Sequence, residues 1–179
     1  MPPSMNLDRS SVKLSLIAIF SALLFLAAFI VKITVGYGAI VYAVVLLTGV
    51  LIIRLPYAAT LTCLISALLY SFISPISLLM LGTFLSRGVT IDALFNIFKV
   101  YRDASNHKYR LYIIIPAMIL SGFASGLYQY FFLVVFMRQL VDFGAFIVST
   151  IFIASIISNA AAGYIVPKYI MPRIRRVMV

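Results

Sequence analysis

The sequence predicts an all-α integral membrane protein, a bundle of six transmembrane helices with both ends of the chain in the cytoplasm. Apolar residues make up 64% of the 179 residues and charged residues 10%, against about half and a quarter in soluble domains. Apolar runs follow one another along the whole chain, so we expect one transmembrane domain, residues 1–179, without a soluble appendage. Lys and Arg collect in alternate connections between these runs.

Each of the six apolar stretches is expected to be a helix, because a crossing of the hydrocarbon core takes about 20 residues. The predicted helices cover residues 12–33, 39–53, 57–73, 76–100, 111–137 and 142–166. The first is longer than the apolar part of a cleavable signal peptide. A glycine turn ends it, Pro56 and Pro75 separate the next three, the polar segment 101–110 precedes the fifth, and Asp142 opens the sixth.

The orientation follows from the basic residues, which concentrate on the cytoplasmic side of membrane proteins. With the amino end inside, the outer side receives Lys32 and Arg138, and Arg87 falls within a helix. The remaining eleven all lie inside: Arg9, Lys13, Arg54, Lys99, Arg102, Lys108, Arg110, Lys168, Arg173, Arg175 and Arg176. Eleven against two indicates cytoplasmic termini, and removing one helix would scramble the alternation.

Several functions are disfavoured by what the sequence lacks. There is no Walker loop, no HExxH, no Gly-x-Ser-x-Gly and no pair of neighbouring carboxylates, so an enzyme is not expected. Cys63 and His107 are single residues of their kind, which argues against a disulfide framework, a metal site or a cofactor. The basic residues flank apolar helices and form no stripe, so nucleic acid is not an expected partner.

Polar groups inside the fourth predicted helix are the most informative, since a charge at the bilayer centre costs at least about 2.5 kcal/mol. Arg87 lies ten residues past Ser77, or about 15 Å into the membrane. Helical spacing places Thr83 with Arg87 on one face, and Asp92 with Asn96 on another. Arg87 either binds an anionic or polar ligand or stabilises neighbouring helices. For Asp92 and Asn96 we favour a structural or coupling role.

The last two helices add polar and aromatic groups in their outer or middle parts. Together with Arg87 they suggest a cavity open to the outside that takes a small planar ligand. The candidate substrate-binding residues are Tyr37, Thr83, Arg87, Tyr128, Gln129, Tyr130, Ser155 and Asn159. For the tyrosines, the alternative is an aromatic belt at the membrane interface, and helical serines are ordinary in membrane bundles.

Two pairs of small residues at four-residue spacing would let helix backbones approach closely. Ala18 and Ala22 form one pair, near Ser15, and Gly122 and Gly126 form the other. Spacing alone leaves open whether either pair packs inside the bundle or meets a partner.

These features together resemble the substrate-binding S component of energy-coupling factor (ECF) transporters. Size and six-span topology agree, and the segment from Ala18 to Ala22 looks like the family's Ala-x-x-x-Ala signature. Further similarity, nearest to the branch for thiamine and its hydroxymethylpyrimidine precursor, lies in the segments Arg54-Leu-Pro-Tyr-Ala-Ala59, Arg87-Gly88 with Asp92 and Phe95, and Ser158-Asn159-Ala160 with Gly163.

The resemblance implies a subunit of the prokaryotic plasma membrane that captures a vitamin or vitamin precursor from outside, with thiamine or hydroxymethylpyrimidine favoured. It implies docking onto a transmembrane T component through the helix-one face with Ser15, Ala18 and Ala22. Partner ATPases would supply the energy for release inside. The alternative is a non-catalytic accessory subunit of a larger membrane complex. A self-sufficient channel or proton-coupled carrier ranks last, since Arg87 and Asp92 make a sparse relay.

Overall fold

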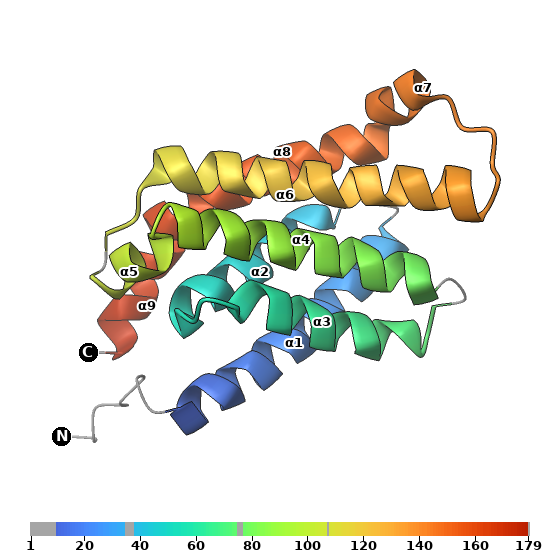
Figure 1. Cartoon of the computed structure of the whole chain (residues 1–179). Coiled ribbons are helices and arrows are strands. Elements are labelled where there is room, and N and C mark those ends of the chain that lie inside the picture. Colours follow the sequence, from blue (N-terminus) through green and yellow to red (C-terminus); the bar gives the residue numbers. More distant parts are fainter. Residues whose placement is uncertain (1–9, 35–37, 75–76, 107, 179) are drawn as a thin grey trace.

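The protein is a bundle of helices whose long axes run side by side (Figure 1). The computed structural model describes residues 10–34, 38–74, 77–106 and 108–178, and this part of the chain contains helices and no strand. The helices are α1 (Ser10–Ile33), α2 (Ala39–Ile53), α3 (Ala58–Ser71), α4 (Ser77–Ile97), α5 (Val100–Ser105), α6 (Leu111–Phe131), η1 (Phe132–Phe136), α7 (Phe143–Val148), α8 (Thr150–Ile165), η2 (Val166–Ile170) and α9 (Met171–Met178). The all-helical fold class is therefore confirmed.

Four helical segments are long and apolar enough to cross a membrane: Ser10–Ile33, Ser77–Ile97, Leu111–Phe136 and Thr150–Ile174. The other two predicted spans form the apolar helices α2 and α3, which have only 15 and 14 residues. At 1.5 Å per residue each is roughly 22 Å long, short of a hydrocarbon core of about 30 Å. Length and composition thus support four of the six predicted spans.

Three predicted boundaries were wrong. The helix predicted to end at residue 166 continues through η2 and α9 to Met178. Residues 101–110 were expected to be a loop, but Val100–Ser105 form α5, which follows a left-handed Lys99 (φ 57°). The sixth predicted helix is interrupted: α7 ends at Val148, and Ser149, with ψ 140°, separates it from α8. Asp142 and Ser149 each cap the helix that follows, by accepting a hydrogen bond from the backbone N–H of its third residue.

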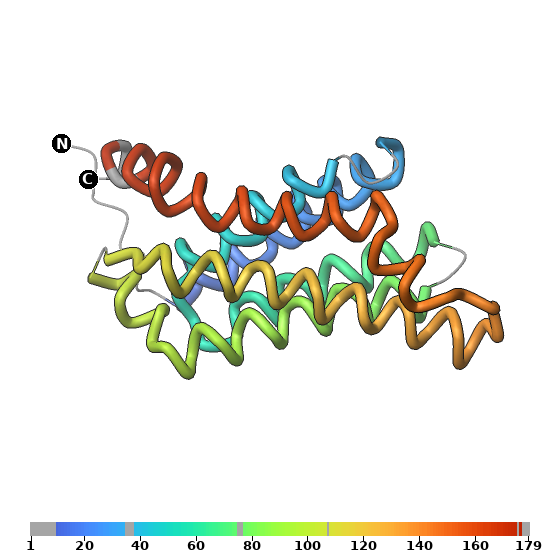
Figure 2. The backbone as a smooth tube through the Cα atoms, turned by 90° about the horizontal axis from the view of Figure 1, so that it is seen from above, coloured from blue at the N-terminus to red at the C-terminus, as the bar shows by residue number. Residues whose placement is uncertain are grey.

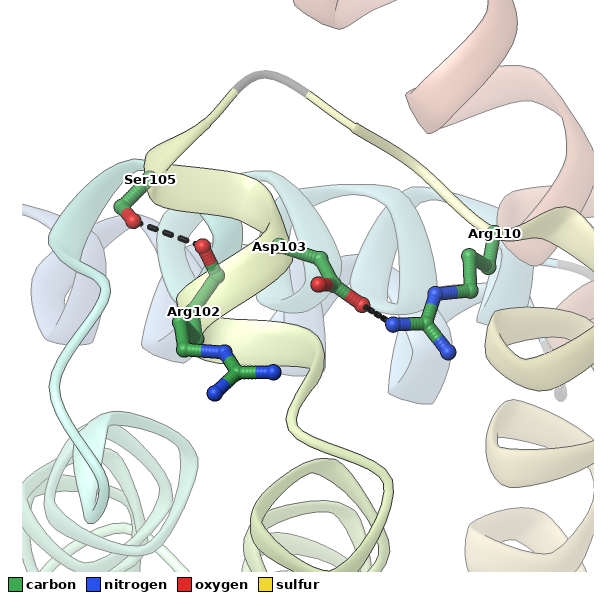
Figure 3. Close-up of polar contacts among 4 residues, drawn as sticks. All are labelled: Arg102, Asp103, Ser105 and Arg110. Carbon is green, nitrogen blue, oxygen red and sulfur yellow. Dashed lines mark hydrogen bonds and ion pairs between the residues drawn. The ribbon is translucent and has the colours of Figure 1, made fainter.

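The connections place the helix ends in two groups (Figures 1 and 2). The beginning of α1, the short α5 and the terminal α9 lie at one end of the bundle, and α7 lies at the other. Both ends of the described chain are therefore at the same end of the molecule. A salt bridge between Asp103 and Arg110 joins α5 to the start of α6 there (Figure 3). Ser105 Oγ donates to the Arg102 carbonyl within α5 at 2.6 Å.

The packing order places α4 between α3 and α6, with α6 against α8 and α2 against α1, α3 and α8. Interior positions are filled by side chains such as Leu24, Leu47, Ile91 and Met118. Large apolar side chains also cover the outside: on α1 alone, Leu14, Ile19, Leu23, Leu26 and Ile33 are exposed. An exterior this apolar is typical of a surface that faces lipid or another membrane subunit.

Candidate functional site

Arg87 is buried at the middle of the bundle, where α2, α4, α6 and α8 meet. Its side chain comes from the eleventh residue of α4 and is 9% exposed. One terminal guanidinium nitrogen donates to Ser125 Oγ of α6 at 3.2 Å and to Ser155 Oγ of α8 at 3.3 Å. The guanidinium carbon also lies 5.0 Å from the ring centroid of Tyr42, a cation–π distance. Three neighbouring helices thus hold one charge.

No described carboxylate neutralises Arg87. The chain has four acidic residues, of which Asp8 lies outside the described residues. Asp92 accepts hydrogen bonds from the backbone of α3, Asp103 pairs with Arg110, and Asp142 caps α7. Arg87 Nε, moreover, has no hydrogen-bond partner. The site consequently contains a buried cation whose acceptors are two neutral hydroxyls and an aromatic face.

Asn159 lies one turn beyond Ser155 on α8 and is 1% exposed. Its Nδ2 donates to the Ser155 carbonyl at 2.9 Å, while its Oδ1 has no partner. The amide packs against Gly122 of α6, where an added Cβ would come within 2.4 Å of Nδ2. Ser155 therefore links Arg87 and Asn159, because its Oγ accepts from Arg87 and its backbone carbonyl accepts from Asn159.

Aromatic residues line the α2 side of Arg87. Tyr42 has its ring centroid 5.3 Å from that of Phe84, one turn before Arg87 on α4, and Phe84 lies 5.9 Å from Tyr70. The Tyr42 hydroxyl contacts Cys63 Sγ of α3 at 3.9 Å. These rings exclude water from one side of the guanidinium, which strengthens any electrostatic interaction it makes.

Asp92 and Asn96 of α4 form hydrogen bonds with the backbone at the start of α3. Asp92 accepts hydrogen bonds from the backbone N–H groups of Ala59 and Thr60, at 3.2 and 2.7 Å, and from the Tyr101 hydroxyl. Ala59 and Thr60 are the second and third residues of α3, the positions whose N–H groups an N-cap side chain satisfies. Asn96 Nδ2 donates to the Pro56 carbonyl at 2.8 Å. One face of α4 thereby fixes the start of α3.

Tyr101 completes this arrangement from α5, outside the candidate spans. Burial, and next the charge of Asp92, raises the pKa of Tyr101 well above its ordinary value. The phenol therefore keeps its proton and acts as a donor over the physiological pH range. Gly88 of α4 lets α3 and α4 approach closely, since an added Cβ would lie 2.9 Å from the Ala59 carbonyl oxygen and the Thr60 Cα.

Three other predicted substrate-binding residues, Thr83, Tyr128 and Tyr130, form their hydrogen bonds away from Arg87. Thr83 is buried one turn away, and its hydroxyl donates to the Leu79 carbonyl of its own helix. Tyr128 packs on Gly82 and donates to the Leu78 carbonyl at 3.3 Å.

Tyr130 donates to the Val141 carbonyl at 3.4 Å and packs against Phe143 and Phe146, near α7. Gln129 is partly buried, one turn past Ser125 on α6. Tyr37 lies outside the described residues.

The two small-residue pairs differ in their surroundings. Gly122 and Gly126 face α8, where added Cβ atoms would meet Asn159 and Phe152, so this pair packs inside the bundle. Ser15, Ala18 and Ala22 are all exposed on α1. We call these three residues and the exposed Leu14, Ile19, Leu23 and Leu26 beside them the α1 face. The α1 face contributes nothing to internal packing at these small residues, and it is free for lipid or a partner.

Sequence reasoning missed three residues of these sites: Tyr42, Ser125 as an acceptor for Arg87, and Tyr101 as a donor to Asp92. Ser125 stood beside a recognised glycine pair, which was a usable signal. Tyr42 lies in an uninterrupted apolar run, where nothing in the local sequence marks it. In the described part of the chain, no three His, Cys, Asp or Glu side chains gather as metal ligands would.

Comparison of the chain with known proteins adds no relative. No family model, no curated protein and no solved structure matches it. The fold and the site described above therefore stand on the chain's own residues and geometry, and the resemblance to ECF S components stays a prediction.

Proposed function

We propose that this protein is the solute-capturing S component of an ECF-type importer in a prokaryotic plasma membrane. It would bind a vitamin or vitamin precursor, with thiamine or hydroxymethylpyrimidine compounds favoured by the resemblance. In this proposal the chain crosses the membrane six times with both termini in the cytoplasm, has no catalytic activity, and depends on a T component and ATPases for energy.

The observation that carries the proposal is the state of Arg87. A buried charge at the centre of a transmembrane helix is costly, and such charges pair with an opposite charge or with backbone carbonyls. Arg87 is held by hydroxyls from two helices and has an unpartnered Nε, and no described carboxylate forms an ion pair with it. A bound solute would supply the missing acceptor, and it would be shielded from water by Tyr42 and Phe84.

A second observation supports the docking part of the proposal. The α1 face carries Ser15, Ala18 and Ala22 outward, where small residues let another helix come close. The Gly122 and Gly126 pair is used inside the bundle. The α1 face is thus the small-residue surface that remains open to a T component.

The test is native mass spectrometry of the protein released intact from mild detergent, before and after incubation with thiamine, hydroxymethylpyrimidine and their phosphates. We expect a stoichiometric small-molecule adduct that disappears in R87Q and persists in R138Q. Arg138 is the matched control because it is an exposed arginine just after η1. A chain that carries no adduct under any of these conditions would favour the accessory-subunit alternative.

A further inference from the structure

We infer that the solute bound at Arg87 is a small organic anion that also carries an N–H or O–H donor, an inference that rests on the proposed function for its setting. The basis is a pair of unpartnered atoms of opposite kind in one buried cluster. Arg87 Nε offers a hydrogen and Asn159 Oδ1 offers a lone pair, and both are without partners.

The charge of the solute follows from Arg87. A guanidinium has five N–H donors and cannot lose its charge. In this structure one terminal nitrogen of Arg87 donates to two serine hydroxyls, and the guanidinium lies over the Tyr42 ring. Neutral hydroxyls are weaker acceptors than carboxylate or phosphate oxygens, whose hydrogen bonds to guanidinium are charge-assisted and often bidentate. An anionic group would take the open Nε and compete well with either serine.

The donor follows from Asn159. Because Nδ2 donates to the Ser155 carbonyl, the orientation of the amide is fixed, and its free atom is an acceptor. At 1% exposure that oxygen cannot reach bulk water, so its partner must come from within the site. Both Arg87 and Asn159 are hydrogen-bonded to Ser155, which places the anionic group and the donor within the span of one small molecule.

This chemistry separates solutes that share a ring system. Of the compounds that the proposed function favours, thiamine carries a positive charge that the guanidinium would repel, and hydroxymethylpyrimidine is uncharged and would leave the charge of Arg87 uncompensated. Their phosphate monoesters, and vitamin acids that carry an amide or hydroxyl group, combine an anion with a donor. The site therefore selects acidic or phosphorylated solutes.

Three probes of nearly equal size test this on the purified chain in detergent: glycolate, acetate and methyl glycolate. Affinity is measured by the rise in thermal-unfolding midpoint with probe concentration, at constant ionic strength in sodium chloride. We expect glycolate to bind about tenfold more tightly than its uncharged methyl ester, the change that one charge-assisted hydrogen bond produces. Acetate, which lacks the hydroxyl donor, should fall between them.

Two variants assign the order to the residues. R87Q should abolish the advantage of glycolate over the ester, and Asn159→Leu, which keeps the side-chain shape, should make glycolate and acetate equal. R138Q should leave the order unchanged. The order is measured on the unmodified chain, so a poorly folded variant does not suspend the test. Equal responses to the three probes, or an order that R87Q preserves, would overturn the inference.

The outcome is separable from that of the proposed function. Suppose that glycolate binds most tightly but that vesicles containing the T component and ATPases show no energised uptake. That result would support the anion site and contradict the proposed importer function. Energised uptake of an uncharged solute, with equal responses to the three probes, would remove this inference alone.

Discussion

At the scale of single residues, Asp92 shows how a buried charge can serve structure. Its two oxygens accept from two backbone N–H groups and the Tyr101 hydroxyl, so every contact is with a donor. A carboxylate employed in this way stabilises the junction of α3 and α4. Arg87, by contrast, keeps an unpartnered nitrogen. Arg87 therefore has a free hydrogen-bond donor for a solute, and the oxygens of Asp92 are already occupied.

We expect Asp92→Asn to destabilise the protein by about 1–3 kcal/mol, since the amide nitrogen must then face a backbone N–H or the phenol. Thermal unfolding in detergent measures the loss. Asp142→Asn is the matched control: Asp142 accepts a single hydrogen bond at the start of α7, and asparagine caps nearly as well. Equal losses of stability in the two variants would show that Asp92 stabilises the protein no more than an ordinary helix cap does.

Gly122→Ala tests the support of Asn159. The new Cβ would come within 2.4 Å of Asn159 Nδ2, so the amide must move, and overpacking of this kind costs about 1–3 kcal/mol. We expect weaker solute binding together with a lower unfolding midpoint. Gly144→Ala, in the exposed α7, should change neither. Unchanged solute affinity in Gly122→Ala would mean that the position of Asn159 does not matter for binding.

The residue-scale predictions from sequence had a clear limit. Burial of Arg87 followed from helical spacing and depth, because both are local properties of one segment. Its contacts with Tyr42 and Ser125 join residues 45 or 38 positions apart, and no local pattern encodes which helices meet. The expected cluster of Thr83, Gln129 and the tyrosines around Arg87 depended on the same unknown packing.

At the scale of helices, the α1 face offers the most direct test of partner docking. Phenylalanine at both Ala18 and Ala22 should prevent another helix from approaching closely. On the proposed function, we expect energised uptake and co-purification of the T component to be lost, while solute binding stays within about twofold because the face lies outside the site. Loss of solute binding as well would contradict a docking role for the face.

The control for this experiment is Leu120→Phe, which adds bulk to an exposed apolar position of α6. It should leave both uptake and binding unchanged, since lipid can accommodate the larger side chain.

Helix positions were largely predictable because apolar runs bounded by proline, glycine and basic residues determine them. The break at Ser149 was missed, since residues 142–166 read as one apolar run. Asp142 and Ser149 were both present as potential caps, seven residues apart, and the second of them was the available signal. The helical α5 was missed because its polar composition is also typical of a loop.

At the scale of the whole molecule, the charge asymmetry and the common position of the two ends of the chain lead to one topology experiment. Cys63 is the only cysteine and is buried, so a Cys63→Ala background allows single cysteines to be introduced. We expect a membrane-impermeant maleimide to label a cysteine at exposed Leu140 in intact cells, and one at exposed Asn106 only after permeabilisation.

Labelling of both positions from outside would show that α6 does not cross the membrane. The reverse pattern would place the basic end outside, and it would invert the orientation that the eleven-to-two distribution of Lys and Arg predicts.

The junction between α3 and α4 also bears on how the protein is made. Helix α3 has only 14 residues, and the side chain of Tyr57 at its N-cap position makes no capping hydrogen bond. The donors of its first turn are satisfied by a carboxylate that the ribosome adds more than thirty residues later. In the proposed six-span topology, α3 would enter the bilayer with the amide groups of its first turn unpaired until that carboxylate arrives. We therefore expect α3 to wait at the translocon and to leave it together with α4, as a hairpin.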